Sequence, residues 1–158
     1  MGFLDALFGD GSTEVLEALK HLPHGDRSIR ETDFRDSAAE FLSATLRDVE
    51  LKREAGVSGT GTRVDLYAHY RGHDYLITIK KGLSEQKIKK VIGECHILLD
   101  HWQARVPGRK TYIIFLPFAL ARARDFDDFA IPFLKFAGGR SDDRFEITLA
   151  LPMGGLPE

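Results

Sequence analysis

The run from Thr111 to Leu116 most constrains the fold of this chain, because it contains no charged side chain. A strand with one face in water alternates apolar and polar residues, whereas a continuous apolar run is typical of a strand buried on both faces. Pro117 marks the predicted end of this strand. The run therefore predicts a sheet that is covered by helices on both of its faces.

Regularly spaced apolar residues define the elements before this run. Helical spacing predicts a helix that begins near Thr32 or Asp33, either of which is a competent N-cap, and that ends near Asp48. Three strands are then expected, at residues 49–54, 64–70 and 75–81. The last two are joined by a short link that contains Gly72, so they predict a β-hairpin.

Two helices and one strand complete the expected order of elements. The clearest helix in the chain opens at residues 82–84 and stops before residues 107–108. A further helix is expected over residues 119–136, interrupted around Pro132, and a last strand over residues 145–149. A strand–helix–strand crossover after the hairpin implies a mixed sheet. The expected fold class is therefore α/β, with a mixed central sheet flanked by helices and a C-terminal helix-strand extension.

The N-terminal residues form a separate helical segment in this interpretation. Residues 1–9 are expected as a short amphipathic turn or helix, and residues 14–22 as a second short helix with an apolar face. Residues 1–22 could pack on the domain, mediate self-association or contact a protein partner, or touch a membrane surface. The first two are favoured because a basic face is missing. The expected organisation is an N-terminal helical segment, 1–25, and a single domain, 26–158.

Composition excludes several classes of protein. The formal net charge is −2, so any binding to nucleic acid requires a local basic face. Cys95 is the only cysteine, which excludes an intrachain disulfide and a multi-cysteine zinc site. No apolar run reaches the roughly 18 residues that span a bilayer, and the N-terminus lacks the basic region and cleavage site of a secretory signal. The expected location is the cytoplasm, with no membrane span.

Asp65 and Lys80 are the residues whose combination most suggests chemistry. Side chains alternate along a strand, so Thr78 and Lys80 point to the same face, and Asp65 can approach both if the hairpin pairs as expected. A carboxylate would hold Mg²⁺ on a scissile phosphate, while a lysine would activate water and offset negative charge. The alternative is that both residues are only solvated or ion-paired at a strand end.

The segments 63–66 and 77–80, with the order of elements around them, resemble the PD-(D/E)xK nuclease superfamily over residues 32–115. The resemblance implies a restriction-endonuclease-like αβββαβ core and phosphodiester hydrolysis that depends on Mg²⁺ or Mn²⁺. It also implies that Asp65 is the first metal ligand and that Lys80 is the catalytic lysine.

Two assisting positions follow from the same resemblance. An acid on the first helix assists the metal, and Asp36 and Glu40 are the candidates, one helical turn apart. Glu40 with Asp65 is the working pair of metal ligands. A glutamine on the helix after the lysine assists in some members, and Gln86 occupies that place.

Thr78 departs from the pattern, since the resemblance leads one to expect Asp or Glu two residues before the lysine. A neutral hydroxyl is a much poorer ligand for a hard divalent cation than a carboxylate. Either the missing charge comes from elsewhere, with Glu85, Glu94 or the first-helix acid as candidates, or the metal site is lost.

The densest basic cluster follows the hairpin and consists of Lys80, Lys81, Lys87, Lys89 and Lys90. Such a cluster can contact phosphates, and we expect nucleic-acid contacts from Lys81, Lys87 and Lys90. A solvated helix end is the alternative.

Three functions remain open at this point. The first is a metal-dependent nuclease that acts on DNA or RNA. The second is a catalytically inactive pseudo-nuclease that binds nucleic acid or a protein. The third is a double-stranded-RNA-binding-like domain, which shares the order α-β-β-β-α. A strand at residues 111–116 within the same sheet would exclude the third, and whether the chain is an enzyme stays undecided.

Overall fold

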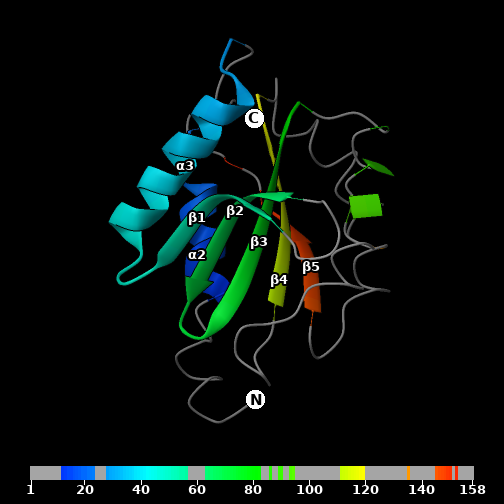
Figure 1. The fold of residues 1–158 in the computed structure, drawn as a ribbon. Helices are drawn as coiled ribbons and strands as arrows, with labels where there is room; N and C mark the ends of the chain where they lie inside the picture. The colour runs from blue at the N-terminus through cyan, green and yellow to red at the C-terminus, as the bar shows by residue number, and fades with distance from the viewer. Residues whose placement is uncertain are drawn as a thin grey trace.

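The computed structural model describes residues 12–23, 28–56, 63–82, 111–119 and 145–150, together with residues 86, 89–90, 93–94, 135 and 152. Within these residues the helices are α2 (Ser12–Lys20) and α3 (Glu31–Thr45). The strands are β1 (Glu50–Gly56), β2 (Arg63–Tyr70), β3 (His73–Lys81), β4 (Thr111–Phe118) and β5 (Phe145–Leu149). The strands form one sheet in the order β1-β2-β3-β4-β5 (Figure 1).

The sheet is mixed, as the sequence predicted. β1 pairs with β2 and β2 with β3 in antiparallel fashion, whereas β3 pairs with β4 and β4 with β5 in parallel fashion. The α/β class is therefore confirmed. The predicted apolar strand is β4, which lies between β3 and β5 and is buried along its whole length. A strand at this place in the same sheet excludes the double-stranded-RNA-binding fold.

The β2–β3 hairpin turns through Arg71 and Gly72, whose φ angles are 50° and 81°. Two consecutive left-handed residues define the type of two-residue turn that matches the twist of antiparallel strands. Tyr70 and His73 pair directly on either side of the turn. The connection is thus shorter than the predicted link over residues 71–74, and β3 begins earlier than expected.

Apolar side chains of α2, α3 and one face of the sheet form a continuous buried cluster. Its sheet residues include Leu66 of β2 and Ile77 and Ile79 of β3. On α3, Phe34 stacks on Phe118 of β4 with ring centroids 4.3 Å apart. Each large apolar side chain buried in this way contributes about 1.5–3 kcal/mol, so the cluster holds the two helices against the sheet.

The apolar face of α2 lies in this cluster rather than on the surface. Val15 and Leu19 are completely buried, and Glu14 accepts a hydrogen bond from the Tyr70 hydroxyl and pairs with Arg71 at 2.9 Å. For residues 12–22 the expected packing onto the sheet is therefore confirmed. Residues 1–11, including the expected helix over residues 1–9, lie outside the described residues.

The boundaries of α3 differ from those predicted. The helix begins at Glu31 with Arg30 as the N-cap residue, which makes no side-chain capping hydrogen bond. Neither Thr32 nor Asp33 is the N-cap, because both lie within the first turn of the helix. The Asp33 carboxylate accepts a hydrogen bond from Arg30 Nε at 3.0 Å. The helix ends at Thr45, before the predicted Asp48, whose φ of 63° is left-handed.

β4 continues through Pro117, where the sequence predicted its end. The Phe115 carbonyl accepts a hydrogen bond from Ala150 N–H on the β5 side. Because alternate residues direct their backbone groups to the same side of a strand, the missing N–H of Pro117 faces that side too. The pairing of β5 reaches only Phe115, so the proline removes no bond from the sheet.

The remaining expectations are only partly covered by the described residues. Within the predicted helix after the hairpin, the described residues with helical backbone are 86, 89–90 and 93–94. Ala119, the expected start of the next helix, has a left-handed φ of 59°, and Lys135 is helical. β5 has the predicted bounds. Among the described residues, the helices are all too short or too polar to cross a membrane.

Candidate active site

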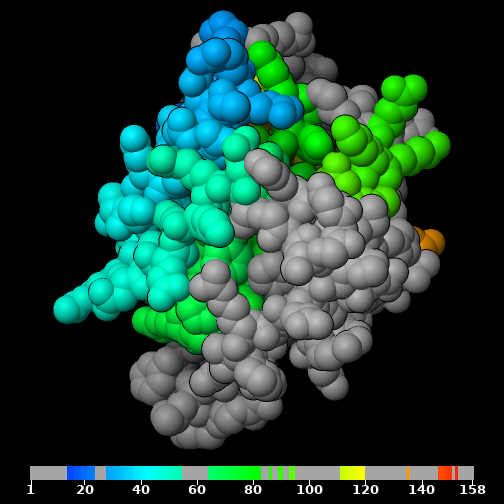
Figure 2. Space-filling view, viewed as in Figure 1, coloured from blue at the N-terminus to red at the C-terminus, as the bar shows by residue number. Residues whose placement is uncertain are grey.

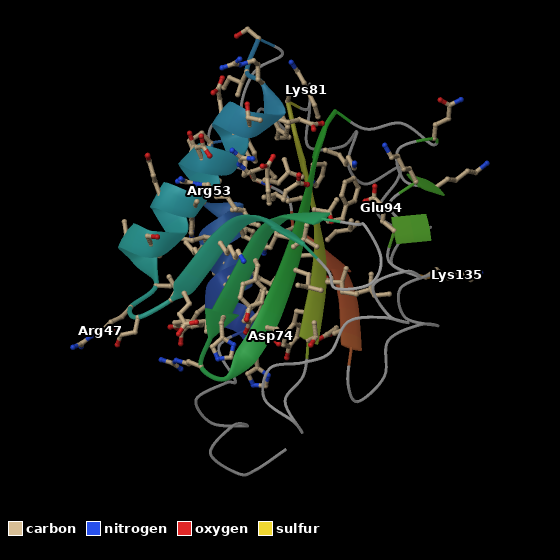
Figure 3. All side chains as sticks on the ribbon, viewed as in Figure 1. Arg47, Arg53, Asp74, Lys81, Glu94 and Lys135 are labelled. Carbon is tan, nitrogen blue, oxygen red and sulfur yellow. The ribbon has the colours of Figure 1, made fainter. Side chains whose placement is uncertain are left out.

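The site lies where β2 begins and β3 ends, opposite the hairpin turn. Backbone pairing of these strands runs from the turn as far as Leu66 and Ile77. Just beyond it, Asp65 Oδ2 accepts a hydrogen bond from the Ile79 N–H at 2.7 Å. The carboxylate thus takes the place of a backbone carbonyl and is fixed against β3 next to Lys80. Figure 3 shows Lys81 and Asp74 at opposite ends of β3, with the site at the Lys81 end.

The electrostatic surroundings of Asp65 hold both signs of charge. Burial raises the pKa of Asp65, while the hydrogen bond from Ile79 and the ammonium group of Lys80 lower it. The carboxylates of Glu31 and Glu94 raise this pKa further. Partial burial strengthens each of these interactions, since salt screens partly buried charges less than exposed ones. Asp65 therefore sits among charges that favour the arrival of a proton or a cation.

Lys80 pairs with Glu94 across the gap between β3 and the helical residues that follow it. Lys80 Nζ lies 3.6 Å from Glu94 Oε1, and the two side chains are 18% and 27% exposed. Lys80 points away from the cluster under α2 and α3, because its neighbour Ile79 belongs to that cluster. Glu94 is one of the residues that the sequence proposed as a substitute for the missing acid at position 78.

Glu31 approaches the same place from the first residue of α3. Its Oε1 accepts a hydrogen bond from the Lys81 N–H at 3.0 Å. Sequence reasoning missed Glu31, because it placed the helix start at Thr32 or Asp33 and looked for the assisting acid further along the helix. Glu31 directly precedes the predicted N-cap Thr32. Because predicted helix boundaries are uncertain by one or two residues, it could have been included among the first-helix acids.

The two predicted first-helix acids have different surroundings. Asp36 Oδ1 lies 3.1 Å from Arg35 Nη2 and 3.2 Å from Arg53 Nε, and Arg35 also pairs with Glu54 at 3.0 Å. These ion pairs join α3 to β1. Glu40 is exposed on α3. The described charged side chains with the largest effects on the pKa of Asp65 are Lys80, Glu31 and Glu94, and neither predicted acid is among them.

The other predicted residues lie around this core. Thr78 is 7% exposed and points to the same face as Lys80. Gln86, Lys89 and Lys90 are exposed, and Lys81 is partly exposed. Figure 2 shows the described residues between 86 and 94 as green atoms at the surface. Lys87 lies outside the described residues.

The donor atoms fit a hard divalent cation. Asp65, Glu31 and Glu94 offer carboxylate oxygens, the ligands that Mg²⁺ and Mn²⁺ prefer. Three carboxylates and the ammonium group of Lys80 have a formal net charge of −2, which a divalent cation would neutralise. In the described part of the chain no three His, Cys, Asp or Glu side chains stand close enough together to hold a metal. Coordination by all three carboxylates therefore requires Glu31 or Glu94 to leave its present partner.

A comparison with solved structures found a similar protein chain. It is SfsA of Pyrococcus furiosus in complex with Ca²⁺, with 17% sequence identity and a TM-score of 0.41. The match covers 83% of this chain and 62% of that protein, so this chain spans less than two thirds of its length. No protein-family model and no curated protein sequence matches the chain.

Proposed function

We propose that this protein is a divergent member of the PD-(D/E)xK class that cleaves phosphodiester bonds in DNA or RNA with Mg²⁺ or Mn²⁺. The observation that carries the proposal is the meeting of Asp65 and Lys80 at the end of β3, with Glu31 and Glu94 beside them. The order of elements from α3 to β4 agrees with the core that the resemblance implies. The basic residues Lys81, Lys87 and Lys90 are proposed to contact the nucleic-acid backbone.

The roles of the residues follow from their chemistry. Asp65, Glu31 and Glu94 would hold the cation, and a bound cation supplies Lewis-acid polarisation of the scissile phosphate. Asp65 is already oriented by its bond to Ile79 N–H. Lys80 would orient the attacking water and stabilise the negative charge that develops on the phosphate oxygens. Glu94 would supply the carboxylate that the sequence lacks at Thr78, from the helical residues that follow β3 rather than from β3 itself.

A second candidate function is a pseudo-nuclease that binds nucleic acid or a protein without cutting. The observation in its favour is Thr78, which is nearly buried and offers no charge to a metal. In that case Asp65, Lys80 and Glu94 would form an ion-pair network that supports the end of β3. The two candidates differ in whether Asp65 binds a divalent cation.

A cleavage assay tests the proposal. The whole chain is incubated with Mg²⁺ or Mn²⁺ and with single- and double-stranded, linear and circular DNA and RNA, beside the Asp65→Asn and Lys80→Met variants. Asp65→Asn keeps an oxygen that accepts the Ile79 hydrogen bond, and Lys80→Met keeps the length of the side chain. Lys20→Met is the matched control, because Lys20 pairs with Glu17 at the same 3.6 Å distance in an exposed position on α2.

The expected result is cleavage by the wild type and by Lys20→Met, with a loss of about 100-fold or more in both site variants. Binding without cleavage, weakening as salt rises, would favour the pseudo-nuclease. Cleavage that survives both site variants would place the active site elsewhere.

A further inference from the structure

Lys80 and Glu94 form an ion pair, and a nearby cation would attract one of the two groups and repel the other. Glu94 is a carboxylate within electrostatic reach of Asp65, so a cation held by Asp65 would attract it. Lys80 carries a positive charge in the same place, so the same cation would repel it. One carboxylate oxygen, Glu94 Oε1, currently stands 3.6 Å from the ammonium group. The ammonium group of Lys80 therefore supplies to Glu94 the positive charge that a bound cation would otherwise supply.

The two nearby carboxylates are held in different ways. Glu31 accepts a hydrogen bond from a backbone N–H, that of Lys81, and this backbone group is fixed by the end of β3. Glu94 is held by a flexible side chain that can move with it or release it. Of these two carboxylates, Glu94 is the one whose present partner can be exchanged without disturbing the sheet.

We propose that Glu94 exchanges partners at this site, pairing with Lys80 in the metal-free protein and turning to a divalent cation at Asp65 when one binds. This inference rests on the proposed function, because it assumes that Asp65 binds the cation. Its consequence is regulatory: Lys80 is engaged by Glu94 until the cation arrives, and only then becomes available to water and phosphate. Arrival of the metal and release of the lysine are one event.

Simple repulsion gives a different expectation from partner exchange. If Lys80 only repels the cation, Lys80→Met tightens cation binding by the same factor whether or not Glu94 is present. If Glu94 must leave Lys80 in order to bind the cation, Lys80→Met tightens cation binding in the wild-type background but not in the Glu94→Gln background. A double-mutant cycle over the two positions separates these cases.

The experiment measures Mn²⁺ affinity of the whole chain by calorimetry, without nucleic acid. The proteins are the wild type, Lys80→Met, Glu94→Gln, the double variant and Asp65→Asn, with Lys20→Met as the control. We expect Lys80→Met to tighten Mn²⁺ binding about tenfold, within the range for coupled neighbouring groups. Glu94→Gln weakens binding by about tenfold or more, and Lys80→Met adds less than about threefold in the Glu94→Gln background. Circular dichroism establishes that each variant is folded.

A second measurement follows Lys80 itself. NMR signals of the Lys80 ε-carbon are recorded during a Mg²⁺ titration, and they are expected to move toward the position that they already hold in Glu94→Gln. An unmoved Lys80 signal in a protein that binds Mg²⁺ would overturn the exchange.

The failures of the two proposals are distinguishable. Equal tightening by Lys80→Met in both backgrounds, with binding still abolished by Asp65→Asn, would overturn the exchange and leave the metal site intact. Absence of Mn²⁺ binding in the wild type would overturn both the metal site and the exchange.

Discussion

The carboxylate of Asp65 is bound to the backbone N–H of Ile79 at 2.7 Å, although burial makes its ionised form unfavourable. Asp65 and Ile79 are 14 residues apart and lie on the two strands of one hairpin. The Ile79 N–H thus donates to a side-chain carboxylate, where in a regular antiparallel pair it would donate to a backbone carbonyl of the neighbouring strand. An oxygen acceptor at this place satisfies the Ile79 N–H, whereas the negative charge serves the cation binding that we propose.

Asp65→Asn is therefore expected to stabilise the metal-free protein while removing metal binding. Because the pKa of Asp65 is raised in the folded state, the folded protein holds this proton more tightly than the unfolded chain. Its contribution to stability falls as pH rises from the unfolded value through the raised folded pKa. Urea unfolding at several pH values should show the variant more stable than wild type at pH 7, with the difference shrinking toward pH 4.

Asp65→Ala is the control for this prediction, because it removes the charge and the acceptor together. The Ile79 N–H then loses its partner, and the fold is expected to lose about 1–3 kcal/mol relative to Asp65→Asn. If the alanine and asparagine variants unfold at the same urea concentration, the hydrogen bond has no structural role.

Thr78→Asp should restore the acid that the resemblance leads one to expect. The new carboxylate would point to the same face as Lys80, so Mn²⁺ binding is expected to tighten about tenfold or more. Thr78 is nearly buried, and an unpaired buried charge is costly, so the metal-free variant should be less stable by at least about 1–3 kcal/mol. Thr78→Asn introduces a neutral side chain of the same size as aspartate, so it should lose stability without the gain in Mn²⁺ affinity. Calorimetry and thermal unfolding with and without Mn²⁺ check both statements.

Tyr67→Phe tests the polar network at the other end of β3. The Tyr67 hydroxyl donates to the buried Asp74 carboxylate at 2.6 Å, and His69 Nδ1 lies 2.8 Å from the same oxygen. Loss of one hydrogen bond to a buried charged acceptor is expected to cost about 1.5–3 kcal/mol. Mn²⁺ affinity should stay within about twofold of wild type, since additivity holds for well-separated sites. A large change in affinity would show that the two ends of the hairpin are coupled.

Tyr70→Phe gives a prediction at alkaline pH. Burial raises the pKa of Tyr70, and its hydrogen bond to Glu14 raises it further, against the opposing effect of Arg71. The unfolded chain releases this proton first, so the stability of the wild type falls as pH rises above the ordinary tyrosine value. The variant should lose about 0.5–1.5 kcal/mol at neutral pH and show a shallower decline between pH 9 and 11. Parallel declines for the two proteins would contradict this assignment.

The sequence predicted those features that depend on neighbours along the chain. The apolar run of β4, the alternating strands of the hairpin and the bounds of β5 are each set by local pattern. The approach of Asp65 to Lys80 follows from the hairpin alone. Within the hairpin and β4, the length of the turn, the start of β3 and the end of β4 needed correction, and the end of β4 depends on where β5 stops.

Glu31 was missed for a physical reason. Its partner, the Lys81 N–H, is 50 residues away in the sequence, and nothing in the local pattern of α3 indicates that contact. Propensity favours Thr32 or Asp33 as the cap, yet the helix begins earlier, at the residue that reaches the end of β3. Asp36 was a reasonable candidate by spacing, but Arg35 and Arg53 hold it elsewhere.

The two-residue turn at Arg71 and Gly72 has a consequence for how the protein acquires its site. Contacts between residues close in sequence form early and at a small entropic cost, whereas distant ones wait for the rest of the chain. The hairpin needs only its own residues to bring Asp65 and Lys80 together. During folding, Asp65 and Lys80 are therefore expected to come together first. Glu31 and Glu94, the acids that would help to bind a metal, join them later.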